Sequence, residues 1–305
     1  MTARAASHVL LIEPVDFRYN PETGDSNPFQ QHVSAVDAER LSHEAAVQHR
    51  RLRDLLIENG VQITVARSRR ETPDAPFCNN WFSTHPPANG RPATLVLYPL
   101  LAPNRRIERR SDLVDLLRHG YGRVVDLSGR ETGGAFLEST GSLCLDDAAH
   151  VAYAALSPRT DQALASEWAR TLGYRLVTFR AADANGVPYY HTNVMMFIGH
   201  GLAGVGLESI VDPAERARVE QSLRESGLEI LPITRDQILQ YCGNCLPLAT
   251  DEGEPLVVMS TTAYEAFSAA ERATIARHGR ILHTPLDAFE TLGGGSARCL
   301  LGELF

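Results

Sequence analysis

Short apolar strands alternate with helices along the whole chain, and this rhythm constrains the fold more than any single motif. Runs of apolar residues predict strands at His8–Ile12, Val61–Val65 and Thr94–Tyr98. Helical spacing fills the intervals, beginning with Gln30–Asn59. This order indicates an α/β fold built of recurrent strand-strand-helix-strand units. Later expected elements are a helix over Arg106–Arg118, a hairpin of Ala135–Leu145 with His150–Leu156, a strand over Tyr189–Ile198 and a helix over Ala263–His278.

The composition bounds the domain organisation, the partners and the location. No linker, low-complexity tract or shift of composition divides the 305 residues, so we expect one domain over residues 1–305. A net charge of −8 without a basic run argues against nucleic acid as a partner. No apolar run approaches a membrane span, and Met1–Arg4 leads into a strand without a secretory signal. Five cysteines, an odd and sparse count, indicate free thiols and a cytoplasmic protein.

Two short motifs imitate cofactor and redox sites. Gly199–Gly204 matches G-x-G-x-x-G after a strand, but the next helix begins only at Pro213, whereas a dinucleotide motif opens directly into a helix. Cys242 and Cys245 form a C-x-x-C pair that follows a predicted helix, and no second ligand pair has zinc spacing. We therefore expect no cofactor and no metal, and interpret the cysteine pair as a helix C-terminal turn.

Two polar groups stand inside apolar stretches. Asn80 lies beside Trp81, and an amide next to an aromatic ring suits a planar polar ligand, although an Asx-turn at a strand end explains the pattern equally well. Glu138 lies in the predicted strand Ala135–Leu145, where a buried carboxylate needs a partner. The small residues around Glu138 favour a functional role over a structural ion pair.

Two further stretches hold titratable groups. His191 and Asn193 would share one face of the predicted strand Tyr189–Ile198, since side chains alternate along a strand, although a histidine at a strand start is more often structural. Gly293–Cys299 ends three glycines with an arginine and a cysteine. A thiol beside an arginine in such a loop can be activated, while a turn before a final strand with a core cysteine is the simpler interpretation.

Together these segments resemble the guanidino-group-modifying superfamily of arginine deiminases, amidinotransferases and dimethylarginine hydrolases. They are most similar to the citrulline-utilisation hydrolases, which are related to the arginine deiminases, and the likeness covers nearly the whole chain. It is carried by the order and spacing of Asn79–His85, Leu137–Ser142, Ser157–Thr160, His191–Met196 and Gly293–Cys299. The resemblance implies the pentein fold, a five-bladed α/β propeller of ββαβ-like units around a central active-site cavity.

The resemblance also implies roles for individual residues. Cys299 matches the nucleophile, His191 the general acid/base, and Glu138 the carboxylate that binds and polarises the substrate head group. Arg159 matches an arginine that binds the α-carboxylate, for which a bidentate guanidinium is suited. The implied mechanism pairs a Cys299 thiolate with His191 as an imidazolium. The remaining substrate-binding candidates are Asn80, Asn193 and Trp81.

One departure from the arginine deiminases bears on the substrate. Those enzymes carry aspartates where this chain has Asn80 and Asn193. An amide both donates and accepts hydrogen bonds, as a ureido group requires, whereas a guanidinium only donates. We therefore expect hydrolysis of citrulline to ornithine, ammonia and carbon dioxide, by a chain that binds a small ureido or guanidino amino acid and whose homo-oligomeric state is open. The alternatives are an arginine deiminase or dihydrolase, because Glu138 is kept, and a non-catalytic pentein binding protein.

Overall fold

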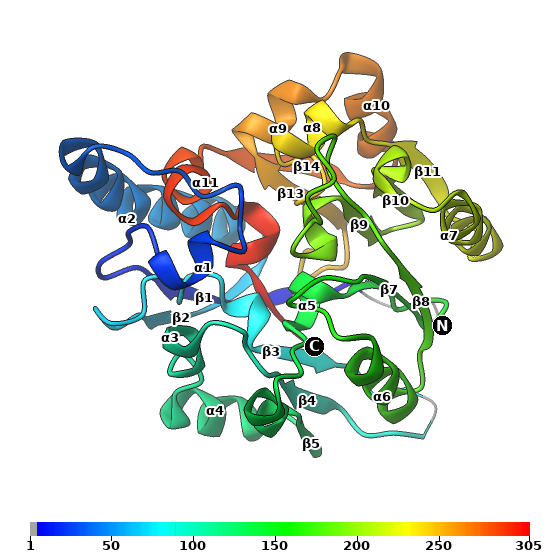
Figure 1. Cartoon of the computed structure of the whole chain (residues 1–305), viewed down its shortest axis with the longest axis horizontal. Coiled ribbons are helices and arrows are strands. Elements are labelled where there is room, and N and C mark those ends of the chain that lie inside the picture. The colour runs from blue at the N-terminus through cyan, green and yellow to red at the C-terminus, as the bar shows by residue number, and fades with distance from the viewer. Residues whose placement is uncertain (1–4, 89) are drawn as a thin grey trace.

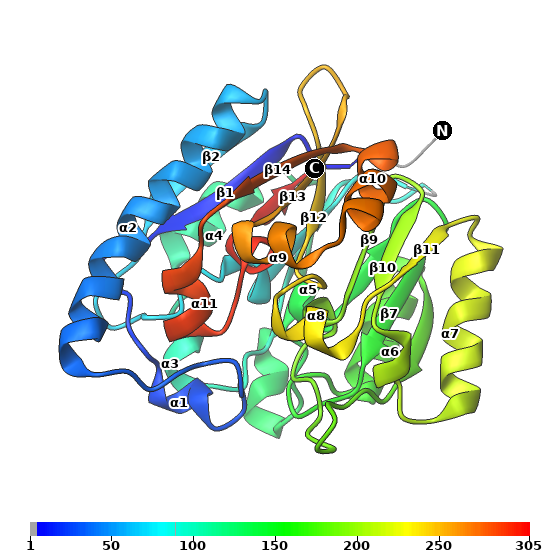
Figure 2. The same ribbon diagram turned by 90° about the horizontal axis from the view of Figure 1, so that it is seen from above.

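The computed structural model describes residues 5–88 and 90–305, so Met1–Arg4 lies outside the described residues. Its strands form five three-stranded sheets. Figure 1 shows the sheets arranged around a common centre, with helices at the rim. Figure 2 places α2 (Ala35–Glu58) and α7 (Pro213–Glu225) on opposite sides of the molecule. The propeller implied by the sequence resemblance is therefore the observed architecture.

All five sheets share one topology. The middle strand is antiparallel to the first strand and parallel to the third. The sheets, in spatial order, are β15 (Gly302–Leu304), β1 (His8–Glu13) and β2 (Gln62–Arg67); β3 (Phe82–His85), β4 (Thr94–Leu97) and β5 (Arg123–Asp126); β6 (Cys144–Asp146), β7 (Val151–Ala155) and β8 (Arg175–Phe179); β9 (Met196–Gly199), β10 (Leu202–Val205) and β11 (Glu229–Pro232); and β12 (Leu246–Ala249), β13 (Pro255–Ser260) and β14 (Arg280–Thr284).

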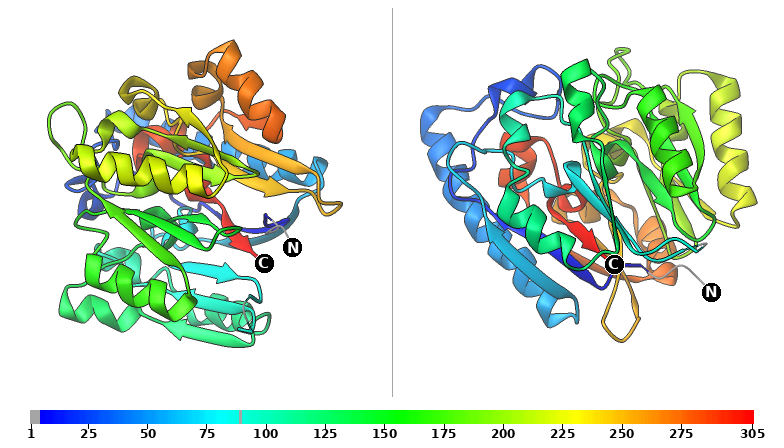
Figure 3. Two further views of the ribbon diagram at one scale, coloured as in Figure 1. Left: turned by 90° about the vertical axis from the view of Figure 1, so that its right-hand side faces the viewer. Right: turned by 90° about the horizontal axis from the view of Figure 1, so that it is seen from below.

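Helices connect the middle strand of each sheet to the third, as a parallel pair requires. Figure 3 shows these helices on the outside of the sheets. They are α2; α3 (Pro103–Arg106) with α4 (Ser111–Arg118); α6 (Gln162–Leu172); α7; and α9 (Thr261–Ala266) with α10 (Ala269–His278). The last strand, β15, pairs with β1 from the start of the chain, so the C-terminal segment completes the first sheet.

Burial decreases from the centre of the propeller to its rim. Every residue of β3, β4, β7, β10 and β12 is buried, whereas β2 and β5 hold only half-buried and exposed residues and β8 begins with an exposed one. The rim helices bury one face; in α6 this face holds Leu164, Trp168 and Leu172 at helical spacing. In the part of the chain that the structure describes, no helix is both long and apolar enough to cross a membrane.

Several expected elements are shorter or different. The first long helix begins at Ala35 rather than Gln30, because the Ser34 side chain accepts the Asp37 backbone N–H as a helix N-cap. The helix expected over Ala263–His278 is broken, since Ser268 starts a second helix with a capping box. The helix expected over Arg106–Arg118 begins only at Ser111, as α4, because the separate short helix α3 already ends at Arg106.

Two predicted strands are wrong at the positions that matter most for function. The hairpin of β6 and β7 exists, but residues 139–142 before it form one helical turn, α5 (Ser139–Ser142). The predicted strand Tyr189–Ile198 is only β9, which follows a 3₁₀ turn, η3 (Thr192–Val194). His191 and Asn193 therefore do not share a strand face.

A short turn precedes the first strand of each sheet, and these five turns lie at the centre. Turns η1, α5 and η3 contact one another in sequence, and η1 also contacts η5. This arrangement directs one polar segment from each sheet toward the same point. The turns are η1 (Cys78–Asn80) before β3, α5 before β6, η3 before β9, Tyr241–Asn244 before β12 and η5 (Ala297–Leu300) before β15.

Candidate active site

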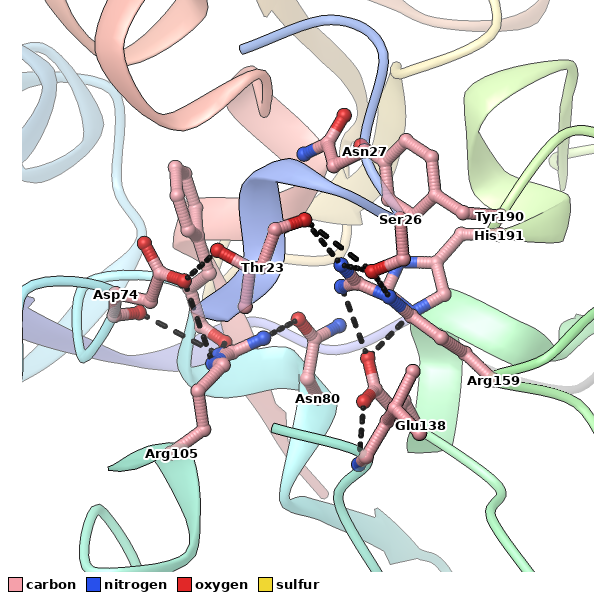
Figure 4. Close-up of polar contacts among 12 residues, drawn as sticks. Thr23, Ser26, Asn27, Asp74, Asn80, Arg105, Glu138, Arg159, Tyr190 and His191 are labelled. Carbon is pink, nitrogen blue, oxygen red and sulfur yellow. Dashed lines mark hydrogen bonds and ion pairs between the residues drawn. The ribbon is translucent and has the colours of Figure 1, made fainter. Parts of the chain in front are cut away.

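A buried carboxylate, imidazole and guanidinium form the centre of the site (Figure 4). Glu138 is the residue immediately before α5, and its Oε2 lies 2.8 Å from His191 Nε2 and 3.3 Å from Arg159 Nη1. The second oxygen, Oε1, accepts the backbone N–H of Leu101 at 3.0 Å. A buried carboxylate is stable only with such partners. Sequence reasoning assigned Glu138 and His191 to one cavity and Arg159 to the substrate α-carboxylate, and the structure brings all three side chains into contact.

Segment 20–30 lies over this cluster and holds Arg159 from the other side. The Arg159 guanidinium donates to Ser26 Oγ at 2.6 Å and to the Thr23 carbonyl at 3.2 Å. It lies 5.0 Å from the ring centre of Tyr190, a cation–π distance. Thr23 Oγ1 also donates to Asp74 Oδ2, at 2.9 Å. Segment 20–30 therefore connects the Arg159 cluster to a second charged cluster (Figure 4).

The second charged cluster is centred on Arg105, a buried residue that sequence reasoning missed. Arg105 Nε and Nη2 each lie 3.0 Å from the Glu108 carboxylate. Arg105 Nη1 donates to Asn80 Oδ1 at 2.7 Å, and because a guanidinium only donates, this contact fixes the orientation of the Asn80 amide. Asn80 Nδ2 donates one hydrogen to Asn79 Oδ1 at 3.1 Å, which leaves its second hydrogen for a ligand.

Asn80 and His191 face each other across Gly141. A Cβ atom at this glycine would lie 2.6 Å from Asn80 Nδ2 and 2.8 Å from His191 Nδ1. The missing side chain thus lets two polar groups from different sheets share one space. The nitrogen of His191 that contacts Glu138 is Nε2, and Nδ1 has no hydrogen bond among the described residues.

The Cys299 thiol faces two asparagine amides. Asn244 Nδ2 lies 3.2 Å from Cys299 Sγ, and Asn193 Nδ2 lies 3.8 Å from it. The sulfur therefore lies beside η3, the turn that follows His191. Asn244 was also missed by sequence reasoning, which interpreted the C-x-x-C stretch that contains it as a helix C-terminal turn. The structure does not bring Trp81 to this cluster; its ring packs in the apolar core against Phe82.

Burial and pairing together determine the charge states. Burial acts to raise the pKa of Glu138, but Arg159 and the His191 hydrogen bond hold it well below its usual range. Burial lowers the pKa of His191 to about 4, despite the hydrogen bond to Glu138. Burial also raises the pKa of Cys299, against the Asn244 hydrogen bond. In the closed structure these shifts favour a neutral imidazole and a thiol, whereas the sequence resemblance implies an imidazolium and a thiolate.

The site is closed in this structure. Cys299, His191, Glu138 and Arg159 are all at most 4% exposed. A cavity of about 500 Å³ lies nearby, lined by Phe29, Tyr189 and Tyr241 among others, and none of the four site residues reaches it. Phe29 also packs against the ring of Tyr190, which contacts Arg159. The segment that carries Phe29 therefore separates this cavity from the charged cluster.

The remaining cavity, the cysteines and the glycine motif do not form a metal, disulfide or dinucleotide site among the described residues. A cavity of about 800 Å³ is lined by residues of β3, β6, β9, β12 and β15. Within residues 5–88 and 90–305, no group of three His, Cys, Asp or Glu side chains could hold a metal ion. All five cysteines are free and buried. Gly199–Gly204 forms the β9–β10 hairpin, which is not the strand-to-helix turn of a dinucleotide site.

Comparisons with known proteins agree with this geometry. A family model described as N,N dimethylarginine dimethylhydrolase, eukaryotic, matches residues 13–305. The chain belongs to this family. The match confirms the resemblance to guanidino-group-modifying enzymes, and this family member is accordingly a guanidino-modifying hydrolase. A search of curated protein sequences finds no match.

Solved structures show the same pentein fold at low sequence identity. The N-terminal domain of ArgZ, covalently bound to a reaction intermediate, matches with a TM-score of 0.76 and 16% identity over 98% of this chain and 97% of that domain. Apo ArgZ, an arginine dihydrolase from the ornithine-ammonia cycle in cyanobacteria, matches with a TM-score of 0.74 and 17% identity over 97% of this chain. That match covers only 40% of the ArgZ chain. A dimethylarginine dimethylaminohydrolase adduct with S-methyl-L-thiocitrulline matches with a TM-score of 0.65 and 16% identity, over 98% and 100% of the two chains.

Proposed function

We propose that this protein hydrolyses citrulline to ornithine, ammonia and carbon dioxide, with Cys299 as the nucleophile. The observation that carries this proposal is the fixed amide of Asn80. Because Arg105 donates to its oxygen at 2.7 Å, the Asn80 amide is oriented with Nδ2 toward the space that it shares with His191, so it offers a ligand there an N–H donor. A ureido oxygen needs such a donor, whereas a guanidinium has no atom that accepts one. Glu138, across the same space, accepts hydrogen bonds from ureido nitrogens.

The charge of the buried centre supports a neutral head group. Two guanidinium groups, Arg105 and Arg159, stand beside the carboxyl groups of Asp74, Glu108 and Glu138. Burial raises the pKa of Glu108 to about 7, against its attraction to Arg105. The cluster thus carries little net negative charge. A cationic head group would gain less there than in a site lined by unpaired carboxylates.

The proposed reaction uses Cys299 as the nucleophile, His191 to transfer protons and Asn80 as a hydrogen-bond donor. Cys299 Sγ attacks the ureido carbon, its proton passes to neutral His191, and the Asn80 N–H stabilises the negative oxygen. One ureido nitrogen then leaves with that proton, giving a thiocarbamate ester. A water molecule gives a proton to His191 as its oxygen bonds to the same carbon, the C–S bond breaks, and His191 returns that proton to the Cys299 sulfur. The carbamate product releases carbon dioxide, so one water is consumed in total.

Arg159 is proposed to bind the substrate α-carboxylate, and this requires it to change partners. In the closed structure its guanidinium contacts Glu138, Thr23 and Ser26. An entering substrate would displace Arg159 from Glu138 and offer it a carboxylate instead, with which a guanidinium forms paired hydrogen bonds. Segment 20–30, which holds Arg159 in place, would then move during binding.

A neutral His191 predicts a broad pH profile. Since its pKa is lowered to about 4, the His191 imidazole stays neutral, and able to accept a proton, from neutral pH down to about pH 5. The raised pKa of Cys299 keeps the thiol protonated on the alkaline side. We expect kcat/KM for citrulline to be nearly flat between pH 5 and the alkaline limit, and to fall as pH approaches 4. A narrow profile with an acid limb near the ordinary histidine value, about 6.5, would contradict this charge state.

Gly141 provides a test of the central space. We expect Gly141→Ala to lower kcat/KM for citrulline by about 100-fold, because the added methyl group would displace Asn80 and His191 from each other. Overpacking should also lower the free energy of unfolding by about 1–3 kcal/mol, which urea denaturation would measure. Gly129→Ala is the matched control, since a Cβ there meets nothing within 4 Å. Equal activity of both variants would place the reaction elsewhere.

An arginine dihydrolase is the second candidate, because the fold matches the N-terminal domain of ArgZ with a TM-score of 0.76 over 97% of that domain. The two reactions differ in their ammonia yield for each ornithine: one from citrulline and two from arginine. Assays with citrulline, arginine and N,N-dimethylarginine, with ornithine and ammonia both measured, therefore separate them. Citrulline turnover at one ammonia for each ornithine supports the proposal. Turnover of arginine alone would overturn it, and no turnover of any of the three would favour a binding protein.

A further inference from the structure

The turn Tyr241–Asn244 occupies the fifth central position, and the mechanism above gives it no role. The other four turns carry Asn80, Glu138, His191 with Asn193, and Cys299. Asn244 is 3% exposed, and its side chain reaches the thiol of the following turn. Because all five turns lie in equivalent positions, we expect the Asn244 amide to act on the sulfur that it contacts.

The hydrogen bonds of Asn244 fix which end of its amide faces Cys299. Asn244 Nδ2 donates to the backbone carbonyl of Asn193 at 3.0 Å, and a carbonyl can only accept. The same nitrogen lies 3.2 Å from Cys299 Sγ, so its second hydrogen points to the sulfur. The sulfur is thus placed as an acceptor, the role that a thiolate fills more strongly than a thiol.

The backbone holds Asn244 between two neighbouring turns. Its carbonyl accepts the backbone N–H of Arg298 at 3.2 Å, next to Cys299 in the chain. On the other side, a Cβ at Gly243 would lie 2.2 Å from the Val194 carbonyl oxygen, so only glycine permits this close packing against η3. The amide is therefore held in position before any substrate binds, as a preorganised donor must be.

We infer that Asn244 is a catalytic residue whose Nδ2–H stabilises the thiolate of Cys299 after the thiol proton has passed to His191. This inference rests on the proposed function, because it requires Cys299 to react as a thiolate. It also supplies a hydrogen-bond donor to the sulfur in a site where Nε2 of His191 is bonded to Glu138. Asn193, at 3.8 Å from the sulfur, contributes less.

The side-chain oxygen of Asn244 indicates a second contribution, to substrate binding. The side-chain oxygens of Asn244 and Asn193 are buried, and neither has a hydrogen-bond partner within the described residues. A buried carbonyl without a partner is costly unless a ligand satisfies it. In the complex, these oxygens would accept hydrogens from the ureido nitrogens that flank the attacked carbon.

The rate of Cys299 alkylation by iodoacetamide as a function of pH tests the inference without any substrate. The tryptic peptide that carries Cys299 is quantified by mass spectrometry, so the other four thiols do not interfere. We expect Asn244→Ala to move the midpoint upward by about one pKa unit, which means about tenfold slower alkylation at pH 7. Asn193→Ala should move it by less, and Asn244→Asp by more, since a carboxylate repels the thiolate.

The outcomes separate this inference from the proposed function. If Asn244→Ala keeps the wild-type midpoint, Asn244 is only a structural residue and the inference is wrong, whatever happens to the melting temperature. If Cys299 in the wild-type protein is not alkylated at any pH at which the protein is folded, and citrulline is not turned over, the proposed function itself is wrong. A graded shift in the order Asp, Ala, wild type, with Asn193→Ala between Asn244→Ala and wild type, supports the inference.

Discussion

Replacing Cys299 with alanine is expected to lower kcat for citrulline by at least about 10⁴-fold, the scale seen when a nucleophile is removed from a catalytic group that acts as a unit. The reason is that the hydrogen bonds of the other four thiols go to backbone carbonyls outside the proposed catalytic group. Cys78, Cys144 and Cys242 are buried elsewhere, and burial raises the pKa of each to about 12. Steady-state ornithine release by Cys299→Ala, measured against wild type, gives the effect directly.

Binding should survive this substitution. The proposed head-group contacts come from Glu138 and Asn80, which do not depend on the sulfur. Citrulline should therefore still raise the melting temperature of Cys299→Ala, as a ligand that binds only the folded state must. Cys144→Ala is the matched control, since Cys144 is a buried thiol on β6 that contacts the Met196 carbonyl. If Cys299→Ala keeps turnover, or if Cys144→Ala loses it equally, the nucleophile assignment is wrong.

The fold was predictable because each of its units repeats the same local pattern. Strand β1 holds a short continuous apolar run, Val9–Ile12, that is buried on both faces, so its length and its apolar character identify it. The helix breaks were not predictable from spacing, because a single cap at Ser34 or Ser268 decides where the chain turns. Pairing of β15 with β1 joins the two ends of the sequence, and no local pattern encodes it.

The site was predictable only where the resemblance supplied it. The pattern around Glu138 and His191 indicated strands, yet both residues precede single helical turns, since short turns carry no measurable periodicity. Asn244 was hidden in a C-x-x-C motif, and its role follows from a contact with a residue 55 positions away. Arg105 lies in an arginine-rich stretch that is typical of a solvated surface, and only the tertiary structure shows that it is buried.

The hydrogen bond from Arg105 to Asn80 leads to a prediction about substrate specificity. We expect Asn80→Asp to lower kcat/KM for citrulline by about 10²–10³-fold, because a carboxylate removes the N–H donor and faces the ureido oxygen with a negative charge. The same change should favour arginine, since a close pair of opposite charges at intermediate dielectric is worth roughly 4 kcal/mol before compensation. Competition between the two substrates, with product identified for each, measures the ratio.

The gain for arginine should be smaller than that limit, because Arg105 already lies 2.7 Å from the Asn80 oxygen and would pair with the new carboxylate. We therefore expect the arginine-to-citrulline ratio of kcat/KM to rise by about 10–100-fold, below the factor that 4 kcal/mol would give. Asn80→Ala is the control: it removes the donor without adding charge and should lower citrulline turnover while leaving arginine unfavoured. If Asn80→Asp and Asn80→Ala shift the ratio alike, charge at this position does not select the head group. The fixed Asn80 amide would then position the substrate without discriminating between the two.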